Sequence, residues 1–287
     1  MRLDYQGPWP EPIGFLLLPR FSMMAFFSAV EPLRIANRIA GKEFFCWHVI
    51  SQDGQPISAS NGMTLLADTS LNSAPALASL AVVASFEPEA TLSRHLIRWL
   101  NQLAQRGCVL GGIDTGSFIL ARAGLLEGQR VTLHWESLPI FRERFPEIDA
   151  TESLYEISTE RFSCAGGAAA MDMALAMIAR RHGETLANAV SEQLIHARMR
   201  TPHDHQRLAL TRRLGTHRHV LVEAVALMER HIETPLSVGV IAEKVGISLR
   251  QLQRLFEQEL GASPRDHYLA LRLSRGASFS GRPITTS

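Results

Sequence analysis

The side chains best suited to chemistry lie in a turn at residues 114–117, Asp-Thr-Gly-Ser. A short apolar run at 109–110 precedes the turn, and apolar residues at helical spacing begin at Phe118. A tight strand-to-helix turn places its first side chain at the carboxyl edge of a parallel sheet, where α/β proteins bind ligands. We interpret Asp114 as the N-cap of the helix, because aspartate is preferred there. A ligand contact or a replaced nucleophile is the alternative.

A second group of polar side chains is predicted on a helix from Ser248 to Leu260. Gly246 is expected to end the preceding helix, and Ser248 and Gln251 have the spacing of a capping box. The polar face of the predicted helix carries Ser248, Arg250, Gln251, Gln253 and Arg254. Arginine pairs well with guanine and phosphate, and glutamine with adenine. We predict a DNA-binding helix-turn-helix, with an ordinary helical hairpin as the alternative.

Charge is unevenly distributed along the chain. Residues 198–287 carry a net charge of +6 and residues 1–197 a net charge of −5, although the whole chain is only +1. A basic C-terminal part attached to an acidic N-terminal part supports DNA as the partner of the C-terminal part.

The composition indicates a globular protein with two domains in 287 residues. No apolar run is long enough to span a membrane, and the N-terminus lacks the pattern of a secretion signal. The three cysteines, Cys46, Cys108 and Cys164, are far apart and form no CxxC pair. We therefore expect a cytoplasmic protein with no cysteine-rich zinc site, no other metal, no cofactor and no membrane contact.

Strand-like and helix-like segments alternate over the first 200 residues. Strands are expected near 13–18, 44–51, 80–84, 109–110, 131–133 and 155–158, and helices near 22–40, 89–105, 118–126, 139–145, 168–182 and 184–200. This order predicts an α/β fold, a doubly wound (flavodoxin-like) parallel sheet domain followed by a small all-α helix-turn-helix domain. The expected divisions are a tail at 1–12, the sheet domain at 10–200, a basic linker at 201–218, the helix-turn-helix at 219–275 and a disordered tail at 276–287.

Two parts of the chain resemble known families. Residues 236–275, LSVGVIAEKVGISLRQLQRLFEQELGASPRDHYLALRLSR, resemble the first half of an AraC-type DNA-binding domain. The N-terminal part resembles the PfpI-type, amidotransferase-like domain through FSMMAFFSAVEPLRIANRIAG, TGSFILARAGLL, HWE at 134–136 and the glycine pair that leads into 166–182. The combination of these two domains is similar to that in the GlxA-type branch of AraC-family regulators. The resemblance implies a homodimeric transcriptional regulator that senses a small quaternary-ammonium metabolite such as glycine betaine or carnitine.

The chain departs from catalytic members of the resembled family at three places. Asp114 stands where they have a cysteine nucleophile, and Ala25 stands where they have an acidic partner. The glycine-rich loop after the third core strand is replaced by 84–86, Ala-Ser-Phe. Because a carboxylate cannot perform thiol chemistry, we expect a sensor rather than an enzyme. A small-metabolite hydrolase or lyase with a DNA-binding appendage is the alternative.

The expected ligand site combines an acid with aromatic rings, because quaternary ammonium groups favour aromatic faces. Its predicted members are Asp114, Thr115, Phe86, His134, Trp135 and Phe26. For Phe26 and its neighbour Phe27, a place in the hydrophobic core is the competing interpretation.

We expect the second helix-turn-helix unit that the AraC resemblance implies to be missing from the C-terminus. The helix that begins at 263–264 is expected to end near Arg275, and the segment 276–287 is rich in Ser, Thr and Gly. Without the second unit, Leu269, Leu271 and Leu273 are expected to be partly exposed. We therefore expect weak, strongly salt-dependent DNA binding unless a dimer supplies a second half-site.

Overall fold

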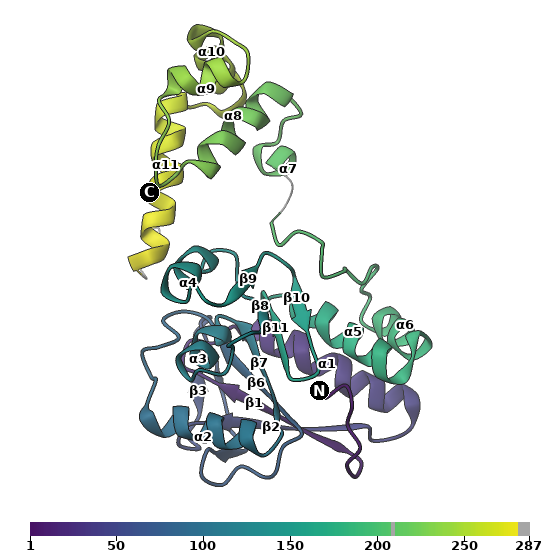
Figure 1. The fold of residues 1–287 in the computed structure, drawn as a ribbon. Helices are drawn as coiled ribbons and strands as arrows, with labels where there is room; N and C mark the ends of the chain where they lie inside the picture. The colour runs from purple at the N-terminus through teal and green to yellow at the C-terminus, as the bar shows by residue number, and fades with distance from the viewer. Residues whose placement is uncertain (208–209, 281–287) are drawn as a thin grey trace. The chain divides into compact units, whose positions relative to one another are not determined.

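The computed structural model describes residues 1–207 and 210–280, and it divides into two compact units. Unit 1 comprises Met1–Gln206 and unit 2 begins at Arg207 (Figure 1). Within the described residues, no helix has the length and apolar character needed to cross a membrane.

Unit 1 is built on a seven-stranded sheet with the order β10-β11-β7-β6-β1-β2-β5. Its strands are β1 (Glu11–Leu17), β2 (Phe45–Ser51), β5 (Thr69–Ser70), β6 (Ser79–Ala84), β7 (Val109–Asp114), β10 (Tyr155–Ile157) and β11 (Arg161–Cys164). Five neighbouring pairs are parallel, whereas β10 and β11 form an antiparallel hairpin. The predicted doubly wound parallel sheet is confirmed, and one antiparallel pair at its edge is added to it. Since β10 and β11 are separated only by a short turn, they pair as a hairpin.

Helices cover both faces of this sheet (Figure 1). One face packs against α1 (Met23–Ala40), α5 (Ala169–His182) and α6 (Glu184–Gln193), and the other against α2 (Arg94–Gln105), α3 (Gly116–Arg122) and α4 (Leu138–Arg144). Neighbouring residues of a strand point to opposite faces, so Phe15 enters the first core and Leu16 the second. Two small sheets, β3 (Ile57–Ser58) with β4 (Thr64–Leu65) and β8 (Arg130–Thr132) with β9 (Asp149–Thr151), complete the unit.

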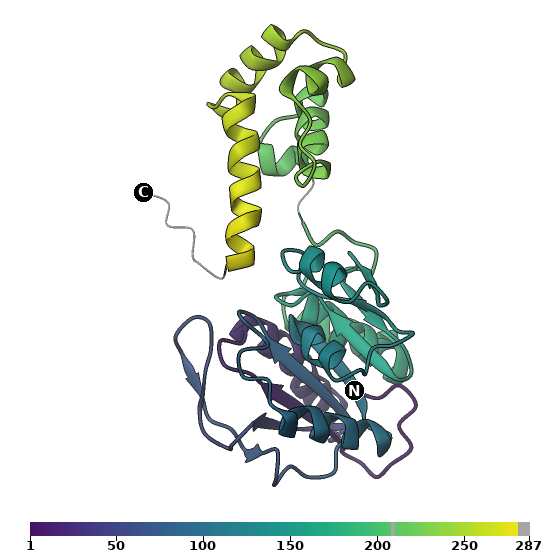
Figure 2. The same cartoon turned by 60° about the vertical axis from the view of Figure 1, so that its left-hand side comes forward.

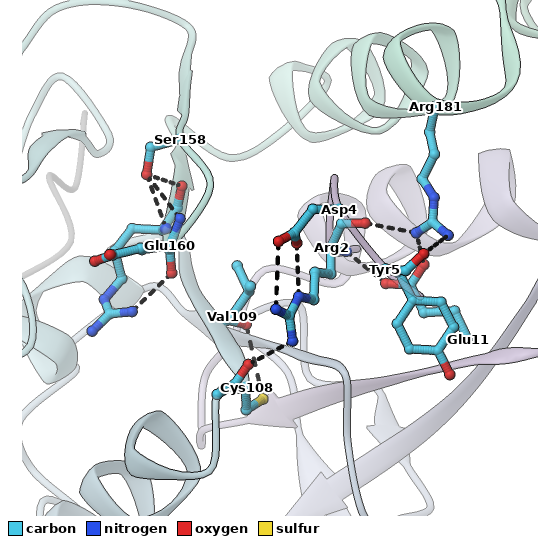
Figure 3. Close-up of polar contacts among 11 residues, drawn as sticks. Arg2, Asp4, Tyr5, Glu11, Cys108, Val109, Ser158, Glu160 and Arg181 are labelled. Carbon is cyan, nitrogen blue, oxygen red and sulfur yellow. Dashed lines mark hydrogen bonds and ion pairs between the residues drawn. The ribbon is translucent and has the colours of Figure 1, made fainter. Parts of the chain in front are cut away.

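The N-terminal segment is part of the fold of unit 1, so the expectation of a tail at 1–12 is wrong. Met1 is buried, and the Arg2 amide donates to the carboxylate of Glu11, the first residue of β1. Arg181, near the end of α5, donates to the same carboxylate and to the Arg2 carbonyl (Figure 3). The Glu11 side chain is fully buried, and the Arg181 side chain is 7% exposed. This buried ion pair therefore fastens the segment to the sheet.

The chain between α6 and unit 2 is irregular. The helix expected at 184–200 ends at Gln193, and residues 194–206 run along unit 1 without regular secondary structure. The range 201–218, expected to be a linker, contains the short helix α7 (Leu210–Leu214).

Unit 2 is entirely helical in its described residues. It contains α7, α8 (His219–Arg230), α9 (Val238–Lys244), α10 (Leu249–Leu260) and α11 (Pro264–Ser280), which Figure 2 shows in green to yellow. The buried residue Tyr268 ties α11 to the end of α8, because its hydroxyl donates to the His231 carbonyl at 2.6 Å. Leu269 and Leu273 of α11 are 50% and 63% exposed, in agreement with the expected partial exposure of these side chains.

The C-terminal helix extends further than the sequence indicated. It was expected to end near Arg275, but α11 runs to Ser280. The remainder of the expected disordered tail, residues 281–287, lies outside the described residues.

We predict that Arg181→Met lowers the free energy of unfolding of unit 1 by about 3–5 kcal/mol, because it leaves the buried Glu11 carboxylate without its cation. Arg180→Met is the matched control, since Arg180 is the exposed preceding residue of the same helix. It should change the stability by less than about 0.5 kcal/mol. Urea unfolding followed by circular dichroism measures both, and equal effects would show that the ion pair does not fasten the segment.

Candidate ligand site and nucleic-acid interface

The turn at 114–117 is built by glycines that allow very close backbone packing. Asp114 ends β7 in the left-handed region with φ of 62°, and α3 begins two residues later at Gly116. A Cβ on Gly116 would lie 2.0 Å from the Val82 carbonyl oxygen of β6, which no side chain could tolerate. Left-handed backbone at a residue with a side chain stores strain of order 1–3 kcal/mol. The strained turn therefore presents Asp114 at the carboxyl edge of the sheet.

Asp114 is not the N-cap of α3, so that interpretation is wrong. Thr115 is the N-cap residue, and no side chain caps this helix. The Thr115 hydroxyl instead donates to the Ser85 carbonyl at 2.6 Å. Thr115 thereby joins the loop after β6 to the loop after β7.

The Asp114 carboxyl group is almost entirely buried. The residue is 7% exposed, and Gly166 lies so close that a Cβ there would be 2.7 Å from the Asp114 Cβ. Burial raises the pKa of Asp114 to about 7; a hydrogen bond with Ser85 acts in the opposite direction, and the nearby Glu136 raises it further. Near neutral pH, Asp114 is therefore protonated in some molecules and ionised in others. The protonated form can donate a hydrogen bond, and the ionised form attracts cations.

The loop after β8 brings His134 and Trp135 to the same edge. The His134 amide donates to the Asp114 carbonyl at 3.3 Å, which ties the loop directly to the turn. The rings of His134 and Trp135 lie 5.6 Å apart, and Trp135 is 36% exposed. Burial lowers the pKa of His134, although Glu136 opposes the shift. His134 is therefore neutral at physiological pH.

The two phenylalanines predicted for the site occupy different environments. Phe86 is 51% exposed, and the Arg20 guanidinium lies 5.1 Å from its ring centroid while forming an ion pair with Glu87. One face of Phe86 thus already receives a cation. Phe26 is 3% exposed and packs edge-to-face on Phe15 in the core. We therefore remove Phe26 from the candidate site.

The two buried cysteines of unit 1, Cys108 and Cys164, are unsuited to nucleophilic chemistry. Burial raises the pKa of Cys108 and of Cys164 to about 12, so neither forms appreciable thiolate at neutral pH. Ala25 is fully buried among apolar residues. In residues 1–207 and 210–280, no three His, Cys, Asp or Glu side chains are grouped to hold a metal ion.

A cavity of about 540 Å³ lies at the opposite edge of the sheet, near the starts of β1 and β2. It is lined by Leu3, Tyr5, Gln6, Trp9, Lys42, Glu43, Phe44, Arg181 and His182. Nothing in the sequence pattern indicated this cavity, because the N-terminal segment that forms one wall was expected to be a tail. Asp114 does not line it.

The predicted DNA-reading helix is α10. Ser248 caps it, and the predicted capping box with Gln251 is confirmed. Leu252 and Phe256 are buried in the core of unit 2. The residues predicted to contact DNA are all exposed, namely Ser248, Arg250, Gln251, Gln253 and Arg254. The Gln251 amide oxygen accepts from the Ser248 amide at 2.9 Å, so its capping role competes with base recognition.

Sequence reasoning missed two neighbours of the candidate ligand site. Arg20 covers Phe86 from the loop after β1, and Gly166 packs on Asp114 from the loop after β11. The glycine pair at 166–167 was visible in the sequence, but its contact with Asp114 depends on the pairing of β11 with β7. No pattern in the sequence indicated that Arg20 would lie beside the candidate ligand site.

We predict that Asp114→Asn stabilises the protein relative to wild type by an amount that grows with pH. The folded wild type keeps Asp114 protonated up to about pH 7, whereas its ordinary pKa is 3.8. Unfolding therefore releases a proton between these values, so wild-type stability falls as pH rises from about 4 to about 7 and then levels off. Urea unfolding of both proteins at several pH values checks this. If the difference in stability between the two proteins does not change with pH, Asp114 has its ordinary pKa in the folded protein.

Comparison with known families agrees with this geometry. The DJ-1/PfpI family matches residues 14–176, and the bacterial regulatory helix-turn-helix proteins of the AraC family match residues 228–267. The crystal structure of an AraC family transcriptional regulator from Pseudomonas putida has a TM-score of 0.60 and 31% identity, and it covers 64% of this chain and 100% of that chain.

The curated relatives include transcriptional regulators whose similarity extends over most of this chain. HTH-type transcriptional regulator CdhR of Pseudomonas aeruginosa is 47% identical over 91% of this chain and 77% of its own length. HTH-type transcriptional regulator GbdR of the same species is 42% identical over 93% of this chain and 72% of its own length. The enzyme isonitrile hydratase of Pseudomonas putida is only 25% identical over 64% of this chain. These relatives confirm a regulator rather than an enzyme: the chain belongs to the DJ-1/PfpI family and to the HTH-type transcriptional regulators with an AraC-type DNA-binding unit.

Proposed function

We propose that this DNA-binding regulator senses a small quaternary-ammonium zwitterion at the carboxyl edge of its sheet, around Asp114. The observation that carries the proposal is a strained, buried acid beside partly exposed aromatic rings. Asp114 stands at the turn, and Trp135 and Phe86 reach the edge from the loops after β8 and β6. A trimethylammonium group has no N–H, so charge and aromatic faces are the features that can recognise it.

The ionisation of Asp114 determines how such a ligand is held. Only the charged carboxylate attracts the ammonium group, and burial raises the Asp114 pKa to about 7. The contact of the Arg20 guanidinium with one face of Phe86 supports a cation-binding role for this ring. The proposed contacts are Asp114, Thr115, Phe86, His134 and Trp135, with glycine betaine and carnitine as the expected effectors.

We predict that glycine betaine binds the wild type about tenfold more tightly at pH 8 than at pH 6, because the ionised fraction of Asp114 rises about tenfold across a pKa near 7. Asp114→Asn should bind weakly and without this dependence. Isothermal titration calorimetry with glycine betaine and carnitine provides the measurement. Tighter binding at the lower pH would instead place the ligand carboxylate against a protonated Asp114, and no binding of either compound would exclude this ligand class.

DNA recognition is assigned to α10, which we propose enters a major groove as the recognition helix. The exposed arginines Arg250 and Arg254 supply charge for phosphate or guanine contacts. A homodimer would double these contacts by placing a second α10 on a second half-site. The helix-turn-helix of the described residues is formed by α9 and α10.

We predict that Arg250→Ala and Arg254→Ala each weaken DNA binding and reduce the dependence of affinity on salt, since each removes about one counterion-releasing contact. Arg98→Ala is the control, because Arg98 is exposed on α2 of unit 1. Fluorescence anisotropy with a labelled duplex at several salt concentrations tests this. Unchanged salt slopes for both variants would remove α10 from the DNA interface.

A further inference from the structure

Residues 194–206, which we call the strap, connect α6 to unit 2 and are fastened to unit 1. Asp172 of α5, whose side chain is fully buried, accepts from the Arg200 guanidinium at 2.6 Å and lies 2.9 Å from the His196 ring nitrogen. The Pro202 carbonyl accepts from the Leu154 amide at 2.9 Å. Hydrogen bonds therefore attach the strap to the rest of unit 1 at several points along its length.

The last fastening point is Gln206, the final residue of unit 1. Its side-chain nitrogen donates to the Thr132 hydroxyl at 3.2 Å, the Leu133 carbonyl at 3.1 Å and the Ser153 carbonyl at 2.9 Å. Its side-chain oxygen is buried and has no hydrogen-bond partner among the described residues. A buried, unpaired amide oxygen costs free energy. The hydrogen bonds of the Gln206 nitrogen thus favour the docked side chain, and its unpaired oxygen lowers the net stability of that docking.

Two of the three groups that hold Gln206, the Thr132 hydroxyl and the Leu133 carbonyl, belong to the same segment as the candidate ligand site. Thr132 and Leu133 directly precede His134 and Trp135 in the loop after β8. The Ser117 hydroxyl of α3 donates to the Thr132 carbonyl at 3.1 Å, so the helix that follows Asp114 is tied to this segment. A ligand that moves the loop therefore also moves two of the three acceptors of Gln206, in Thr132 and Leu133.

Unit 2 begins at the next residue. The Arg207 side chain donates to Glu229 of α8 at 3.3 Å, inside the unit that carries α10. Two consecutive residues are therefore anchored in different units, one beside the ligand-site loop and the other on the DNA-binding unit.

We propose that Gln206 is the coupling contact of this regulator: its hydrogen bonds to Thr132, Leu133 and Ser153 transmit the state of the Asp114 edge to the DNA-binding unit. This inference rests on the proposed ligand site. Binding at His134 and Trp135 shifts the Leu133 carbonyl, which alters the docking of Gln206 and so the freedom of Arg207 and the helices that follow. Coupling between two sites is reciprocal, so DNA binding must also change the loop at 132–135.

Gln206→Met is the informative variant, because methionine has a similar length and lacks the amide. Gln193→Met, at the exposed end of α6, is the matched control for the same chemical change. Circular dichroism verifies that both variants are folded.

The first measurement needs no effector. Amide hydrogen exchange at residues 132–135 is recorded with and without saturating random-sequence duplex DNA at low salt. In wild type and Gln193→Met, DNA should change the exchange by about fivefold or more, the lower end of typical coupling between sites. In Gln206→Met the change should disappear while anisotropy still shows DNA binding. An unchanged exchange in wild type, or an equal change in all three proteins, overturns the coupling role.

The second measurement separates this inference from the proposed effector. Glycine betaine binding is measured by calorimetry, and its effect on DNA affinity by anisotropy, in the same three proteins. Retained betaine binding with loss of its effect on DNA affinity in Gln206→Met alone supports the coupling role, whereas a retained effect overturns it. If betaine does not bind wild type, the betaine assignment fails and the exchange result alone decides the role of Gln206.

Discussion

The approach of α3 to β6 is the contact on which the organisation of unit 1 depends. Gly116 lies so close to the Val82 carbonyl that a Cβ there would be 2.0 Å from its oxygen. The chain passes directly from β7 into α3 at this point, and Asp114 takes the left-handed conformation at the turn. The side chain is consequently aimed at the carboxyl edge and buried, and its raised pKa follows from that burial.

A catalytic protein with this fold would need a reactive nucleophile at this turn. This chain instead has the carboxyl group of Asp114 there. A carboxyl group with a pKa of about 7 changes charge near neutral pH, and the buried thiols Cys108 and Cys164 stay protonated there. The turn is therefore suited to recognising charge rather than to forming a covalent intermediate. This agrees with the relationship to the transcriptional regulators CdhR and GbdR.

The proposed coupling between the Asp114 edge and Gln206, the last residue of unit 1, consists of short-range contacts. The amide of His134 contacts Asp114, the hydroxyl of Ser117 contacts Thr132, and Thr132 contacts Gln206. Each contact is an ordinary hydrogen bond, and each joins segments far apart in the sequence. A regulator needs an element with two arrangements of similar free energy. The half-satisfied amide of Gln206 supplies a physical reason for such a balance.

The sequence by itself determined the features that depend on neighbouring residues. Alternating strands and helices indicated the doubly wound sheet, and the spacing of Ser248 and Gln251 indicated the capping box, because both patterns act within a few residues. Tertiary structure decided the rest. It made Thr115 rather than Asp114 the N-cap, and it placed Phe26 in the core. It also docked residues 194–206 on unit 1, through contacts as distant as 74 residues, which no local pattern encodes.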